Sequence, residues 1–280
     1  MSFKYFFWNE KEFLELDPTG KAYGFALYSP GHLIWLAVIL LAAVLISSMY
    51  LHKGGAGKKK LLTNAIAYPE NERLCESGRR NMRRFFAIMI VLSEIYRDSV
   101  LYFTGFFNVE HLPFHLCGLA IFAIVIDAFW ENQTLTRQMI AFAFMPGAVA
   151  ALLFCNWTMY PFLNFMSIHS FVFHGWILFY LVMRYRAGEI KPTYKGMWMT
   201  ILIVLVISGP MFLFNRTFGT NFMFLNEASE GSPLIPIWNL LYPDYGYVGY
   251  VGGFAALVVI VLHIVWVIYT LLGKCKRKTV

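Results

Sequence analysis

The stretch EHLPFHLCGLAIFAIVIDAFW, residues 110–130, decides the class of fold. From Leu112 onward its only ionisable side chains are those of His115, Cys117 and Asp127. The hydrocarbon core of a bilayer is about 30 Å thick, and a helix needs roughly 20 mostly apolar residues to cross it. Residues 112–130 are therefore typical of a transmembrane helix, and the imidazole and thiol near its start require a reason.

Further apolar windows occur on both sides of this stretch. They cover residues 31–51, 84–106, 138–156, 161–183, 197–215 and 247–272. The window 84–106 contains Glu94, Arg97 and Asp98, but its flanks, GRRNMRRFF and FTGFFN, are typical of span ends. The sequence therefore predicts an all-α fold, a polytopic membrane bundle of seven transmembrane helices.

The composition agrees with a membrane protein. The chain has 280 residues, of which 59% are hydrophobic and 14% charged, whereas about a quarter of the residues of soluble domains are charged. The four cysteines are too few and too scattered for a disulfide framework. These features predict one membrane domain, with most of the protein surface facing hydrocarbon.

The basic residues predict the orientation. Of the 23 Lys and Arg residues, 18 fall between the first two windows, in the next two alternate connections or after the last window. Basic residues concentrate in cytoplasmic loops, so the N-terminus is expected outside and the C-terminus inside. The net charge of +7 then needs no nucleic-acid partner, and membrane lipids are the expected partners.

These spans divide the chain into three parts. Residues 1–30 are expected to form an extracellular or interfacial segment with a short interfacial helix at 3–16. Residues 31–273 form the seven-helix domain, and 274–280 a basic cytoplasmic tail. The outer connection 215–247 is expected to cover a pocket. The predicted location is a cell membrane, crossed several times.

Polar side chains of two spans are expected in the outer half of the bundle. At 1.5 Å per residue, Glu94, Arg97 and Asp98 lie about 12–18 Å below the outer end of their span. His115 and Cys117 lie about 5–8 Å below the outer end of theirs. Ionisable groups inside spans usually face the bundle interior or a wet cavity, so these residues predict a polar pocket.

The fifth span adds two histidines to the same half. His169 and His174 lie about 12 Å and 20 Å below its outer end and about 140° apart around the helix. One of them is expected to face the pocket and the other to pack, and we favour His169 for the pocket. His115 and Cys117 point about 200° apart in a regular helix, so both face one pocket only if the turn LPFHLC is irregular.

Structural interpretations of the same residues stay open. A buried cysteine usually behaves as a small hydrophobe, so Cys117 is also explained by packing. Glu94, Arg97 and Asp98 are also explained as a structural ion network. The histidines form neither an HxxxH nor an HExxH motif. No metal ligands and no cofactor are therefore expected.

Four segments resemble the YwaF-like integral membrane proteins of Gram-positive bacteria. They are SPGHLIWLAVILL at 29–41, LPFHLCGLAIF at 112–122, YPFLNFMSIHSFVFHG at 160–175 and GTNFMFLNEASEGSPLI at 219–235. That family is similar to an animal multi-span acyltransferase that remodels ether phospholipids through a cysteine centre. It is more distantly similar to the androgen-induced lipid hydrolases, which pair a threonine nucleophile with a histidine.

The resemblance implies an outer-leaflet lipid acyltransferase or lipase acting on phospholipid acyl esters. Cys117 would be the nucleophile and His169 its base. The supporting residues would be His115, His174, Glu94 and Asp98, and the substrate-binding residues Arg97 and Asn221. Two alternatives remain: a small-molecule or proton-coupled transporter that uses Glu94, Arg97 and Asp98, and a seven-helix receptor or sensor. The sequence gives no oligomeric state.

Overall fold

The computed structural model describes residues 6–7, 12, 15, 23–51, 74–130, 133–229 and 232–278, with side chains as far as residue 273. Every regular element in these ranges is a helix. The helices are α2 (Pro30–Leu51), α3 (Glu76–Phe103), η4 (Val109–His111), α4 (Leu116–Phe129), α5 (Thr134–Met139), η5 (Ile140–Phe144), α6 (Met145–Leu153), α7 (Phe165–Arg186), α8 (Tyr194–Phe218), η6 (Phe222–Phe224) and α9 (Ile235–Lys278). Most of the interfacial helix expected at 3–16 lies outside the described residues.

Five helical stretches are long and apolar enough to cross a membrane. They are α2, the continuous stretch Thr134–Leu153, α7, α8 and the part of α9 from Ile235 to Gly273. The helix α4 is apolar but shorter, and the 28-residue α3 carries charges along its length. Each predicted window falls on one of these helices. The chain is thus an all-helical, multi-pass membrane protein.

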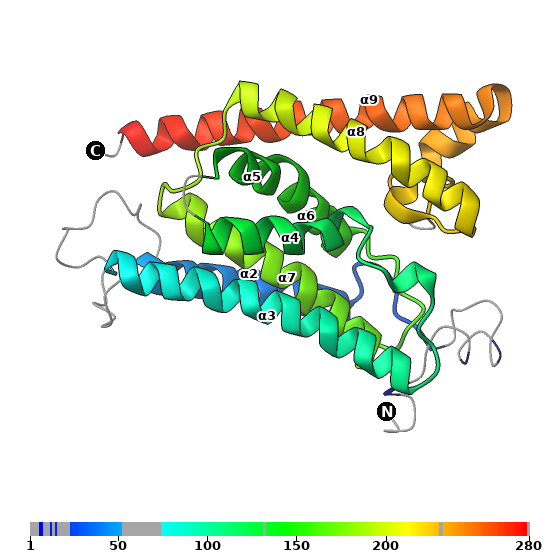
Figure 1. Cartoon of the computed structure of the whole chain (residues 1–280), viewed down its shortest axis with the longest axis horizontal. Helices are drawn as coiled ribbons and strands as arrows, with labels where there is room; N and C mark the ends of the chain where they lie inside the picture. Colours follow the sequence, from blue (N-terminus) through cyan, green and yellow to red (C-terminus); the bar gives the residue numbers. More distant parts are fainter. Residues whose placement is uncertain are drawn as a thin grey trace.

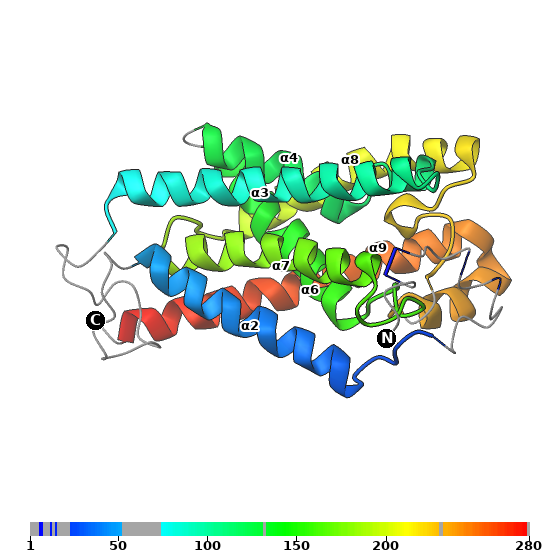
Figure 2. The same ribbon diagram turned by 90° about the horizontal axis from the view of Figure 1, so that it is seen from below.

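The helices lie roughly along the long axis of the molecule and alternate in direction (Figure 1). Helix α7 lies centrally and packs against α2, α3, α4 and α6. Helices α8 and α9 lie beyond α5 and η5, on the side away from α2 and α3 (Figure 1). Seen from below, α8 passes behind α3 and α4, and α9 passes behind α7 (Figure 2). The centre of the bundle is filled by large, fully buried side chains, among them Phe142, Phe144, Ile177 and Tyr180.

The fourth predicted span is not one regular helix. It begins at Thr134, four residues before the predicted start, and passes through the π-helical turn η5 before α6. Pro146 lies in the first turn of α6. Proline has no backbone N–H and clashes with the carbonyl four residues earlier, which accounts for the widened turn. All five side chains of η5 are buried.

The expected outer connection 215–247 is largely helical instead. Helix α8 continues to Phe218 and ends at Gly219, whose φ is 66°. Helix α9 starts at Ile235 and turns sharply at Gly246 (φ 58°, ψ −148°). The part before Gly246 folds back on the part after it, so that the Trp238 and Tyr250 ring centroids are 4.9 Å apart. Aromatic packing, which a hydropathy window does not detect, stabilises this hairpin.

Candidate functional site

Glu94, Arg97 and Asp98, the three charged residues in the C-terminal half of α3, form one cluster. Arg97 Nη2 lies 2.6 Å from Glu94 Oε1 and 2.7 Å from Asp98 Oδ1, and Arg97 Nε donates to Asp98 Oδ1 at 3.0 Å. Arg97 Nη2 also donates to the backbone carbonyl of His111 at 2.7 Å. The guanidinium therefore joins α3 to the loop that leads into α4.

His169 on α7 faces this cluster. Its Nε2 lies 3.7 Å from Glu94 Oε2, beyond a normal hydrogen bond. Both atoms are buried and have no hydrogen-bond partner among the described residues. The imidazole stacks on Phe173, with centroids 5.7 Å apart. The packing of α3 on α7 thus aims two unpaired polar atoms at each other.

His111 lies in η4, outside the apolar helices. Its Nδ1 accepts a hydrogen bond from the Asn108 backbone N–H, while Asn108 Oδ1 accepts one from the Glu110 N–H. Burial, and then the positive charge of Arg97, lower the pKa of His111 below its usual 6.5. The neutral imidazole is the form that this capping arrangement requires, because it accepts at Nδ1.

His115 precedes α4 rather than lying within it. Its backbone is extended (φ −65°, ψ 155°) and the helix begins at Leu116, four residues after the predicted start of this span at 112. The irregular turn frees His115 and Cys117 from the 200° separation of a regular helix. The His115 ring packs between Phe222 and Phe224, and its Nδ1 accepts from the Met223 N–H at 3.3 Å.

Cys117 lies in the first turn of α4 as a partly buried free thiol. Its Sγ lies 3.8 Å from the position that a Cβ on Gly147 of α6 would occupy. It packs against the same core cluster as Phe173 and Ile177 of α7. Among the described residues the thiol makes no hydrogen bond, so the structure does not place it in direct contact with His169.

His174 occupies a different face of α7 from His169. Its Nδ1 lies 2.7 Å from the Ser170 carbonyl oxygen, and its ring stacks on Trp157, with centroids 5.2 Å apart. A carbonyl only accepts, so Nδ1 carries the proton and Nε2 offers a lone pair. The Phe173 ring contacts both imidazoles of α7, with its centroid 5.7 Å from that of His169 and 5.4 Å from that of His174.

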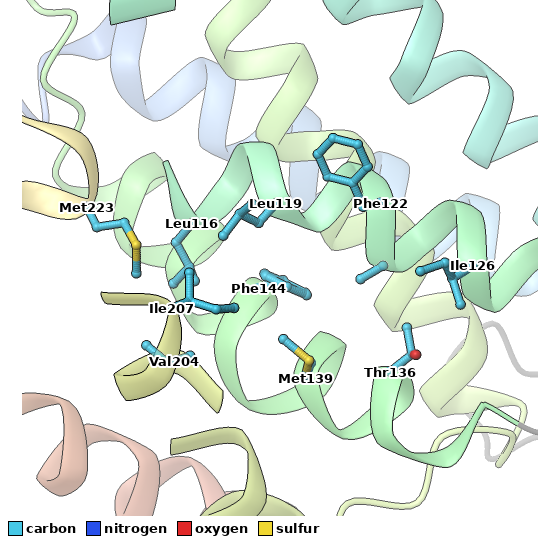
Figure 3. A pocket seen from close by; sticks show the side chains of 11 residues that line it. Leu116, Leu119, Phe122, Ile126, Thr136, Met139, Phe144, Val204, Ile207 and Met223 are labelled. Atoms are coloured by element: carbon cyan, nitrogen blue, oxygen red, sulfur yellow. The ribbon is translucent and has the colours of Figure 1, made fainter. Parts of the chain in front are cut away.

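An apolar pocket of about 220 Å³ begins beside this region (Figure 3). It lies between α4, the α5–η5 stretch and α8, and Met223 of η6 lines one end. Phe122 and Ile126 line it while remaining 53% and 41% exposed, so it opens sideways from the protein. The other lining residues are Leu116, Leu119, Ala123, Thr136, Met139, Phe144, Val204 and Ile207.

The side chain of Asn221, a predicted substrate-binding residue, makes hydrogen bonds to the chain that follows η6. Its Oδ1 accepts from the Asn226 and Glu227 backbone N–H groups at 3.1 and 3.3 Å, and its Nδ2 donates to the Glu227 carbonyl at 3.0 Å. These bonds fold the chain that follows η6. The structure therefore shows the Asn221 side chain bonded to the backbone of Asn226 and Glu227, and its substrate-binding role stays a prediction.

A second cysteine and histidine lie close together on the other side of α7. Cys155 Sγ is 3.9 Å from His32 Nε2, and both residues are buried. His32 Nε2 also lies 2.8 Å from the Leu152 carbonyl, and its Nδ1 accepts from the Tyr28 N–H at 2.9 Å. Both ring nitrogens are thus occupied in joining α2 to the end of α6, so His32 has no free nitrogen to deprotonate Cys155.

The opposite end of the bundle holds a second charged network, centred on Asp127 and Glu189. Asp127 Oδ1 accepts from Arg137 Nε at 2.9 Å, and its Oδ2 accepts from Tyr180 and Arg184. Arg184 also donates to Glu189 at 2.8 Å. Tyr50, Arg79 and Arg83 complete the network around Glu189.

Together these features define a multi-pass helical membrane protein with a buried polar cluster beside an apolar, sideways-opening pocket. The described residues contain no group of three or more His, Cys, Asp or Glu side chains that could hold a metal ion. The model of the TMEM164 family matches residues 27–271, and the chain belongs to this family of membrane proteins. Comparisons with curated proteins and with solved structures each found no match.

Proposed function

We propose that this protein is an outer-leaflet lipid acyltransferase or lipase that acts on phospholipid acyl esters through Cys117. The proposal includes seven spans, with the N-terminus outside and the C-terminus in the cytoplasm of a bacterial cell. The resemblance to the YwaF-like proteins and to cysteine-centred acyltransferases supports it. The excess of basic residues at one end of the helices supports the orientation.

The position of the apolar pocket carries the proposal. Leu116 and Met223 line one end of the pocket. Leu116 directly precedes Cys117 in the chain, and the Met223 backbone N–H donates a hydrogen bond to His115. From Leu116 to Ile126 the pocket follows α4 for about 15 Å. Its walls are apolar apart from Thr136. An acyl chain entering between Phe122 and Ile126 would be held with its ester end at the turn that carries Cys117.

The chemistry requires a thiolate, because the thiol itself is a poor nucleophile. We assign the role of base for Cys117 to Nε2 of His174, because its Nδ1 carries the proton, whereas Nε2 of His169 faces Glu94. The thiolate attacks the ester carbonyl, and the bond from that carbon to the glycerol oxygen breaks. The imidazolium returns its proton to that oxygen, which releases a lysolipid and leaves an acyl thioester on Cys117.

Arg97 is suited to the phosphate of the same lipid. A guanidinium binds phosphate through parallel N–H donors. Its bonds to Glu94, Asp98 and His111 use Nε and Nη2, and we assign Nη1 to the phosphate. The charge that remains after pairing with two carboxylates is small, so this contact positions the headgroup more than it adds affinity.

Intact-protein mass spectrometry after incubation with phospholipid vesicles tests the proposal. We expect a hydroxylamine-labile acyl adduct in the natural protein and in Cys155→Ser, the matched control. The adduct should be lost in Cys117→Ser and formed at least a hundredfold more slowly in His174→Gln, as for loss of a general base. A natural protein that never acquires an acyl group on Cys117 would refute the proposed reaction.

One observation favours a second function, a proton-coupled transporter. Glu94 Oε2 and His169 Nε2 are buried and unpaired inside an apolar bundle, and such pairs occur in proton relays. Proton flux into liposomes, lost in Glu94→Gln while Cys117→Ser remains active, would establish this function in place of acyl transfer.

A further inference from the structure

The gap between Glu94 and His169 has the dimensions of a site for one oxygen atom. Glu94 Oε2 and His169 Nε2 are 3.7 Å apart. Hydrogen bonds to oxygen or nitrogen are about 2.8 Å long. An oxygen atom placed beside the line between Glu94 Oε2 and His169 Nε2 is therefore within hydrogen-bonding distance of both. Polar groups separated by more than about 3.5 Å are commonly bridged in this way by a water or a ligand hydroxyl.

The surrounding contacts hold both atoms in place. Glu94 Oε1 is fixed by Arg97, which is itself held by Asp98 and the His111 carbonyl. This leaves Oε2 directed toward α7. On the other side, the His169 ring is held by its stacking on Phe173. A buried polar atom without a partner is costly, so a bound water gains from two prepared acceptors and a bound alcohol from one of them.

The site is connected to Cys117 through packed side chains. Phe173 stacks on His169 and belongs to the same buried cluster against which Cys117 packs. Helix α4, which carries Cys117, packs against both α3 and α7. The charged and titratable groups nearest to His169 are Glu94, Arg97 and His174, with Asp98 and His111 behind Arg97.

We propose that Glu94 and His169 bind the hydroxyl group of the acyl acceptor and remove its proton in the second half of the reaction. This inference rests on the proposed function and assigns the two histidines of α7 to different steps. The acceptor is a hydroxyl, either that of a lysolipid or that of water. A water can donate one hydrogen to each acceptor, and an alcohol donates its single hydrogen to His169 Nε2.

The proton and bond changes balance as follows. The hydroxyl proton passes to His169 Nε2 while its oxygen forms a bond to the thioester carbonyl, and the Glu94 carboxylate stabilises the imidazolium. The bond from that carbon to Cys117 sulfur then breaks. The leaving thiolate takes up the proton that the His169 imidazolium releases, so that the imidazole and the thiol both return to their starting forms. The products are an ester or a free fatty acid and the original thiol.

The experiment measures the two half-reactions separately. Cys117 is first acylated by phosphatidylcholine vesicles, and the loss of the adduct is then followed by intact-protein mass spectrometry. One arm contains lysophosphatidylcholine and the other buffer alone, which separates alcohol from water as the acceptor. The variants are Glu94→Gln, whose amide oxygen still accepts from Arg97, and His169→Gln. His263→Gln, a histidine elsewhere in the bundle, is the matched control.

We expect both variants to acquire the adduct at nearly the natural rate and to lose it at least a hundredfold more slowly, in one or both arms. Loss of the adduct at the natural rate in both variants would overturn the inference and leave the proposed function standing. Failure of His169→Gln to acquire the adduct would make His169 the base of Cys117, and would also overturn it. If the natural protein acquires no adduct, the proposed function and this inference both fail.

Discussion

The two charged clusters described above are both built around arginine–carboxylate pairs but differ in completeness. Around Asp127, whose side chain has no exposed surface, both carboxylate oxygens have partners: Arg137, Tyr180 and Arg184. Around Arg97, one oxygen of Glu94 and one nitrogen of His169 have none among the described residues. A completed network fixes helices in register, whereas an incomplete one retains the capacity to bind.

The largest effect should follow from removing the centre of the completed network. Asp127→Ala leaves Arg184 buried with one fewer anion, which should cost about 3–5 kcal/mol of unfolding free energy. Unfolding in mixed micelles, followed by tryptophan fluorescence, measures it. Arg137→Ala is the control, because this partner is 24% exposed and exposed pairs contribute up to about 1 kcal/mol. Equal losses of unfolding free energy for the two variants would contradict the view that Asp127 is the centre of this network.

A smaller effect is expected from Tyr180→Phe. The variant keeps the ring in the core but deletes the hydroxyl that donates to Asp127 Oδ2 at 2.8 Å. A hydrogen bond to a charged group contributes about 1.5–3 kcal/mol, and the same unfolding assay should show a loss in that range. Tyr185→Phe, in the next turn of α7, supplies the comparison. No change for Tyr180→Phe would mean that Arg184 alone satisfies that oxygen.

Glu94→Gln should cost less than about 1 kcal/mol in unfolding free energy, although Glu94 is as buried as many core residues. The amide oxygen can replace Oε1 as the acceptor for Arg97, and Oε2 has no hydrogen bond to lose. A loss of unfolding free energy as large as that of Asp127→Ala would show that the cluster around Arg97 is a structural network as well. Stability measured beside the half-reaction rates would then reveal whether folding or chemistry is affected.

The smallest effect concerns the pH dependence of stability that arises from His111, at the edge of the cluster around Arg97. Because the pKa of His111 lies below 6.5 in the folded protein, the unfolded chain takes up this proton first as the pH falls. The stabilising contribution is complete above about pH 6.5 and is lost as the pH falls through the folded pKa. His111→Gln should flatten the dependence of unfolding temperature on pH between 7 and 5. An unchanged slope would contradict this assignment.

The positions of the helices could be predicted from hydropathy, because a membrane-spanning segment is a local property of the sequence. The π-helical turn at Ile140–Phe144 and the hairpin at Gly246 were missed. Each depends on how one residue, Pro146 or Gly246, alters the backbone within an otherwise uninterrupted apolar run. A sliding window averages such residues away.

The candidate site could be predicted only in part for a different reason. The i, i+5 spacing of His169 and His174 correctly separated the two rings around α7. Which ring meets Glu94 depends on the packing of α3 against α7, which no spacing within one helix specifies. Likewise, the partner of His115 is the Met223 backbone, 108 residues away in the chain. The Cys117–His169 pairing stays a prediction.

The wall of the apolar pocket that α8 supplies is anchored unequally at its two ends. Near its start, Gln138 of α5 bonds the Lys191 carbonyl and the Thr193 N–H, both at 2.9 Å. Near its end, α8 leans on the ring of Phe114 through Phe214, with centroids 5.4 Å apart. The start of α8 is thus held by polar bonds to Gln138, whereas its end is held by aromatic packing and is freer to move. We therefore expect the lateral pressure of the surrounding lipids to change the width available to an acyl chain most near Phe214, where α8 is held by ring packing.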